Sequence, residues 1–196
     1  MGFALLVGWG RSNQRLAGLT RRIMDRLNAQ PSKGPITLSR GYLTIHSVPS
    51  ALTRHVEWAL HNLLGQSAQV QWQQQPLLAA TFRTTVEWRD CQGVGAEIAS
   101  SLRGWHYLRF EIREESAHES VLYRYTPNLG IHRAVIDGAG SIMINENQIS
   151  SALATSNVNE EALRNALENL LGSQWDQELE QFRRVELEGI SQSRAI

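Results

Sequence analysis

The chain has 196 residues, of which 42% are hydrophobic and 19% charged, and its formal net charge is zero. This length and composition are typical of a soluble globular protein that can bury a core within one domain. The single cysteine excludes an internal disulfide and a cysteine-based zinc site, and it favours a reducing compartment, the cytoplasm. No apolar run approaches the roughly 20 residues that a membrane-spanning helix needs, so we expect no membrane segment.

Residues 1–40 are predicted to form a basic extension. They hold seven basic residues and one acidic residue, a net charge of +6, so the remaining residues carry −6. Apolar residues recur there at helical spacing between arginines: Leu16, Leu19, Ile23 and Leu27. One interpretation is a basic amphipathic arm for an anionic surface or nucleic acid. The other is a poorly ordered extension, present because translation was assigned to start too early.

Residues 41–113 contain four alternating segments and two helical segments in the order βαββαβ. The strands are predicted at Tyr42–Ser47, Gln69–Gln73, Ala80–Arg89 and Tyr107–Arg113, and the helices at Ser50–Leu64 and Gly95–Leu102. Each strand is apolar on one side, which carries Leu43, Phe82 and Phe110, and polar on the other. An antiparallel sheet with helices on a single face produces this pattern. We therefore expect an α+β fold with a ferredoxin-like sandwich as its core.

The rest of the chain is predicted to extend this sandwich. Residues 114–145 read as β-hairpins, with strands at Val121–Tyr125, Ile131–Ile136 and Ile142–Ile144. Residues 146–184 read as helices, two of them capped by Asn145 and Asn159, and the last running over Gln174–Arg184. Their apolar stripes need cover, so residues 41–196 are expected to form a single domain.

Several blocks of sequence, in order, resemble one known family. They are His46–Ala51, His55–Leu60, Gly93–Ala96, Ser101–Trp105, Leu108–Glu111, Tyr125–Gly130 and Leu171–Glu180. From Gly41 onward the chain resembles an uncharacterised actinobacterial family, domain of unknown function 3145 (DUF3145). The resemblance implies a cytoplasmic bacterial protein and implies no activity. Residues 1–40 fall outside it, which favours the second interpretation of the extension.

A glycine-rich turn lies between a predicted strand and a predicted helix, at Gly93-Val94-Gly95-Ala96. Backbone N–H groups at such a turn can cradle phosphate. The turn is similar to the pyrophosphate-binding turn of coenzyme A-dependent N-acyltransferases, but Asp90 stands where that family has an arginine or glutamine. A tight loop entering a helix explains the two glycines equally well. A transferase that uses an acyl-coenzyme A is therefore the alternative function.

The sequence contains no complete metal-binding motif. His55-Val56-Glu57 matches half of a zinc deaminase signature, whose other half needs two cysteines, so that class is excluded. His46 and His55 could meet near the end of the first strand, but the six histidines show no close ligand spacing. We expect no metal, no cofactor and no catalytic residue.

The polar side of the predicted sheet is the most informative surface for function. His46, Arg83 and Arg109 should point from it. RNA-recognition modules stack bases on aromatic residues there, but their aromatic core motif is missing and the body is acidic, so nucleic acid is disfavoured. The face is either solvated or capped by the C-terminal hairpins. The preferred hypothesis is a non-enzymatic cytoplasmic binding or regulatory module for a protein partner, a second copy or a small anionic ligand. Its candidate binding residues are His46, His55, Arg83, Arg109, Gly93 and Gly95.

Overall fold

The α+β class is confirmed. The computed structural model describes residues 38–156 and 159–193, with side chains up to residue 185 except that of residue 91. Seven strands in this part of the chain form one antiparallel sheet in the order β2-β3-β1-β4-β5-β6-β7. The predicted basic extension lies outside the described residues up to residue 37, and its last three residues begin β1.

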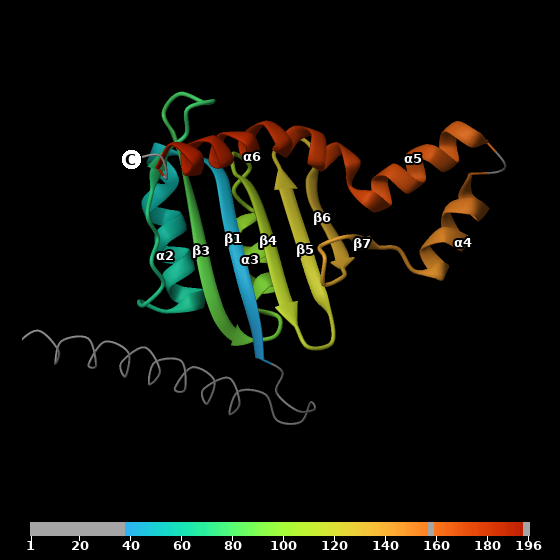
Figure 1. The fold of residues 1–196 in the computed structure, drawn as a ribbon, viewed down its shortest axis with the longest axis horizontal. Coiled ribbons are helices and arrows are strands. Elements are labelled where there is room, and N and C mark those ends of the chain that lie inside the picture. Colours follow the sequence, from blue (N-terminus) through green and yellow to red (C-terminus); the bar gives the residue numbers. More distant parts are fainter. Residues whose placement is uncertain (1–37, 157–158, 194–196) are drawn as a thin grey trace, which may run out of the picture.

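Figure 1 shows how the elements follow one another along the chain. The strands are β1 (Leu38–Pro49), β2 (Gln73–Gln74), β3 (Thr81–Cys91), β4 (Arg109–Ser116), β5 (Ser120–Thr126), β6 (Gly130–Ile136) and β7 (Ile142–Met143). The helices are the 3-10 turn η1 (Ser50–Leu52), α2 (Thr53–Leu64), α3 (Val94–Leu102), α4 (Glu146–Thr155), α5 (Glu160–Leu171) and α6 (Ser173–Ser193). The predicted hairpin region therefore continues the same sheet instead of forming a separate layer.

The second predicted strand is much shorter than its alternating pattern indicates. Val70 and Trp72 pack partly buried against the core, as their pattern requires, but only Gln73 and Gln74 pair with β3. A strand needs a hydrogen-bonded neighbour as well as an apolar face, and alternation reports only the second condition. The prediction of a strand over Gln69–Gln73 was correct only at its last residue.

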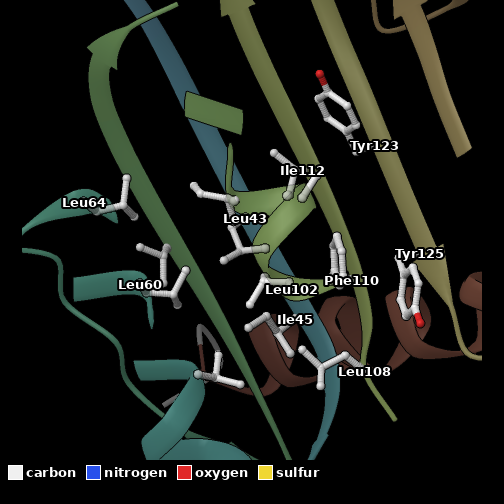
Figure 2. Packing of buried hydrophobic residues seen from close by; sticks show 14 of the residues in the cluster. Leu43, Ile45, Leu60, Leu64, Leu102, Leu108, Phe110, Ile112, Tyr123 and Tyr125 are labelled. Carbon is white, nitrogen blue, oxygen red and sulfur yellow. The ribbon is translucent and has the colours of Figure 1, made fainter. Parts of the chain in front are cut away.

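The core lies between the sheet and the helices α2 and α3. Leu43 and Ile45 of β1 and Phe110 and Ile112 of β4 are fully buried there, as the alternation predicts. Figure 2 shows these side chains pointing toward Leu60 and Leu64 of α2 and Leu102 of α3. The rings of Phe110 and Tyr125 stack across neighbouring strands with centroids 5.1 Å apart. Each such buried side chain contributes about 1.5–3 kcal/mol to folding.

The polar face of the sheet is partly covered by a helix. Figure 1 shows α6 crossing the front of the sheet near one end of the strands, with α2 and α3 behind. The sequence left open whether this face is solvated or capped by the C-terminal hairpins. The cap is α6, which packs against β1 and β5. This helix continues past the predicted end at Arg184 to Ser193.

Candidate functional site

Besides the buried Leu179 and Phe182, charged groups join α6 to the sheet residues beneath it. Glu111 of β4 lies at the centre of this contact, and its carboxylate is 16% exposed. It accepts a hydrogen bond from Nε of Arg183 at 2.9 Å and a second one from Nη2 of the same guanidinium. Nε2 of His46 lies 2.8 Å from Oε2 of this carboxylate, the oxygen that also accepts from Nε of Arg183. Two elements of the sheet and one helix therefore meet at a single carboxylate.

The charge of Glu111 is strongly stabilised. Burial by itself raises the pKa of a carboxyl group, but the hydrogen bonds from Arg183 and His46 outweigh that effect and lower the pKa of Glu111 to about 2. The hydrogen bond to Glu111 also raises the pKa of Arg183, against the opposing effect of burial. This pair is ionised at every physiological pH, so it acts as a fixed clamp and not as a proton donor or acceptor.

A second buried arginine fastens the start of α6. Arg124 of β5 is 1% exposed, and its Nη1 lies 2.6 Å from the Asp176 carboxylate. Its Nη2 donates to the carbonyl of Leu171 at 2.9 Å, at the end of α5. His132 of β6 lies beside it, and burial together with the Arg124 charge lowers the pKa of this histidine. Gly172 passes so close that a Cβ atom there would lie 2.7 Å from Arg124.

The structure brings two of the predicted site residues together on this face. His46 and Arg109 both contact the ring of Phe182, with the His46 ring centroid 6.3 Å and the Arg109 guanidinium carbon 5.4 Å from the ring centroid. Arg109 also pairs with Glu178 of α6 at 2.9 Å. Both predicted ligand-binding side chains are therefore engaged in holding α6.

Arg83 of β3 lies on the same face of the sheet, and none of the described acids pairs with it. Its Nε and Nη1 atoms are buried and have no hydrogen-bond partner among the side chains and backbone that the structure describes. Its position in β3 lies opposite a register shift of β1 between Ile45 and Val48. The hydroxyl of Ser47, inside this irregularity, is likewise buried without a partner in the described part of the chain. A cluster of unsatisfied polar atoms therefore lies at this end of the sheet.

His55 does not join this group. It is exposed on α2, which covers the opposite face of the sheet, so the sequence-based meeting of His46 and His55 does not occur. His46 turns instead toward Glu111. The helix α2 packs on the core face of the sheet, so its side chains can reach that face only. The side chain of His46 points from the opposite face of β1.

The glycine turn before α3 already holds an anion. Gly93 donates its backbone N–H to Oε1 of Glu114 at 2.8 Å, and Gly95 donates to Oε2 at 3.2 Å. Glu114 is 4% exposed, on the core side of β4, and the hydroxyl of Ser39 also donates to it at 2.7 Å. A carboxylate of the chain thus occupies the position that a phosphate would take at this helix start.

A family model described as a protein of unknown function, DUF3145, matches residues 42–191. This match covers more than half of the chain. The chain belongs to the DUF3145 family. No curated protein and no solved structure matches the chain.

The matched part of this DUF3145 chain contains the whole contact between the sheet and α6, together with Arg83 and the Gly93–Gly95 turn. Within the described residues, no three His, Cys, Asp or Glu side chains gather closely enough to bind a metal ion. In the same residues, no helix combines the length and apolar character required to cross a bilayer.

Sequence reasoning missed the partners that come from α6. Asp176 and Arg183 lie on the last helix, for which the sequence analysis considers only the apolar residues. Arg124 lies in a predicted strand whose polar side chains receive no role there. A usable signal was present: Arg109, Glu111 and Arg124 project from adjacent strands on the face opposite the core, where an amphipathic helix with acids and arginines could pair with them.

Proposed function

We propose that this DUF3145 protein is a non-enzymatic module that binds a small anion at Arg83. The observation that carries the proposal is that two nitrogens of the half-buried Arg83, Nε and Nη1, are buried without a hydrogen-bond partner in the described part of the chain. Burying a charge without a partner is costly, and proteins keep such a charge where a ligand of opposite sign completes it. Carboxylate and phosphate groups match the planar donor set of arginine best.

The surroundings favour a small ligand over a large one. Arg83 stands between Gln73 of the short strand β2 and the irregular part of β1. Figure 1 shows α6 crossing the same sheet. Ser47, in the irregular part of β1 opposite Arg83, has a buried hydroxyl without a partner among the described residues. A compact carboxylate or phosphate compound fits these groups, whereas the basic residues His46 and Arg109 on the same face already contact acids.

The coenzyme A alternative gains no comparable support. Glu114 accepts from the same N–H groups that a pyrophosphate would need, so binding there would require this buried carboxylate to leave.

The ferredoxin-like topology and the cytoplasmic location are also part of the proposal. The order β2-β3-β1-β4, with α2 between β1 and β2 and α3 between β3 and β4, supports a ferredoxin-like unit. The single cysteine supports a cytoplasmic location.

The test is a thermal-shift screen against small carboxylates and phosphates, followed by calorimetric titration of any compound that raises the melting temperature. We expect at least one anion to bind the natural chain and Arg83→Met to abolish that binding. Because Arg83→Met removes two buried nitrogens that have no partner among the described residues, the variant should melt at the same or a higher temperature without ligand.

Arg89→Met is the matched control, since Arg89 lies on the same strand and face but is exposed. It removes the same charge and should leave anion binding unchanged. Equal loss of binding in both variants would mean that the anion responds to overall charge. The absence of any shift across the panel would remove the proposal altogether.

A further inference from the structure

The hairpin formed by α4 and α5 stands away from the sheet. α4 packs against α5, and α5 packs against the start of α6, while Figure 1 shows the pair projecting beyond β6 and β7. Ala152 is the buried residue of α4, and every residue of α5 keeps at least partial exposure. Two amphipathic helices are therefore left with apolar side chains that no described element covers.

These side chains lie in two pairs, one on each helix of the hairpin. Ile149 and Leu153 are four residues apart on α4 and are 42% and 54% exposed. Leu167 and Leu171 have the same spacing on α5; Leu167 is half-buried and Leu171 is 39% exposed. Residues four apart lie on the same side of a helix. The four residues Ile149, Leu153, Leu167 and Leu171 are called the apolar strip below.

The borders of the apolar strip are acidic. Residues 146–171 contain four glutamates and one arginine, a net charge of −3. Glu146 and Glu160 lie in the first turns of their helices, and helical spacing places them beside the strip. The side chain of Glu160 is 89% exposed and forms a surface ion pair with Arg164, which such exposure makes weak. The occupant that suits this surface is a helix with apolar residues at spacings of three and four and with basic residues beside them.

Such a segment exists in the same chain, outside the described residues. Residues 15–27 carry four arginines and one aspartate, a net charge of +3, which balances the hairpin. Their apolar residues, Leu16, Leu19, Ile23 and Leu27, recur at spacings of three and four. A second copy of the hairpin would instead bring two acidic borders together, which is unfavourable. We propose that the apolar strip of the α4–α5 hairpin binds residues 15–27, from the same chain or from a second copy.

The test places a photo-crosslinking amino acid at Leu153 of the full-length chain, an exposed position that tolerates substitution. After irradiation, mass spectrometry should find residues 15–27 attached at this position. Mixing isotope-labelled and unlabelled chains tells whether the crosslink joins one chain or two, and either result supports the proposal. The control places the same amino acid at Ser151, which is exposed and lies on the other side of α4. It should capture this segment poorly.

Charge reversal gives an independent measurement. Arg22→Glu together with Arg26→Glu should lower the crosslink yield about tenfold, and Glu146→Arg together with Glu160→Arg in the same chain should restore part of it. Crosslinks from Leu153 to residues 143–171 of another copy would show self-association through the strip and overturn the proposal. If Leu153 captures no residue from 15–27, at low or at high salt concentration, the proposal is overturned as well.

Discussion

At the scale of single residues, the contact beneath α6 depends on Glu111. This carboxylate touches both His46 of β1 and Arg183 of α6. Its immediate surroundings stabilise a negative charge, since the two side chains that contact it are basic. Truncating any one member leaves another buried group without its partner, which is more costly than losing the pair as a unit.

We predict that Glu111→Gln lowers the free energy of unfolding by about 3 kcal/mol at neutral pH. A pKa lowered from 4.5 to about 2 corresponds to roughly that free energy. Because the pKa is lower in the folded state, this contribution is present above pH 4.5 and is lost as the pH falls toward 2. Urea denaturation at pH 7, 4 and 3 measures it.

Glu87→Gln is the control for that series, because Glu87 pairs with Arg40 on the exposed part of the same face. Exposed ion pairs contribute little, so its effect should be small at all three pH values. A similar loss in both variants would show that Glu111 is not the centre of the contact.

At the scale of elements, α6 is held by two kinds of interaction. Leu179 and Phe182 bury its apolar side completely or nearly so, and Arg183, Asp176 and Glu178 pair with the sheet. The apolar residues give most of the attraction, while the charged pairs fix the direction and the register in which the helix lies across the strands.

We predict that Phe182→Ala lowers the free energy of unfolding by about 3 kcal/mol or more, because it removes a buried ring and leaves a cavity. Its neighbours His46 and Arg109 lose their contact with that ring. Gln181→Ala, one position earlier on the exposed side of α6, should leave stability nearly unchanged. Guanidinium denaturation followed by far-UV circular dichroism distinguishes the two, and equal stability of both variants would contradict the packing described.

Local patterns predicted the elements better than their partners. The alternation of Leu43 and Ile45 and of Phe110 and Ile112 identified β1 and β4 and their buried side, because a half-buried strand imposes a period of two. Asn145 and Asn159 marked the starts of α4 and α5, since their side chains accept hydrogen bonds from the first backbone N–H groups.

Pairing between distant segments could not be read in the same way. Glu111 and Arg183 are 72 positions apart, and Glu114 meets Gly93 across 21 positions. Nothing local to either residue identifies the other. The polar face was correctly assigned to Arg83 and Arg109, but which of its charges stays unpaired depends on where α6 lies, and that is a property of the assembled structure.

At the scale of the whole molecule, we predict that stability falls as the pH drops below about 6.5. Burial and the Arg124 charge lower the pKa of His132 below its ordinary 6.5, so the folded protein favours the neutral ring. The stabilisation is present above pH 6.5 and is lost as the pH falls through the lower folded value. His132→Gln should flatten the dependence of melting temperature on pH between 7.5 and 5.

His55→Gln provides the comparison for this measurement, because His55 is exposed on α2 and has no part in the contact with α6. Its melting curves should follow those of the natural protein across the same range. A pH dependence that survives His132→Gln unchanged would assign the acid sensitivity to another group.

The charged contact beneath α6 also determines which surface is exposed to solvent when this helix detaches locally from the sheet. The strand surface then uncovered carries imidazole, carboxylate and guanidinium groups, which water solvates readily. Leu179, Phe182 and Trp175 are large apolar side chains of α6 that would then meet solvent. We therefore expect the form in which α6 has detached to remain soluble. Detachment of α2 or α3 would instead expose the hydrophobic core and favour aggregation.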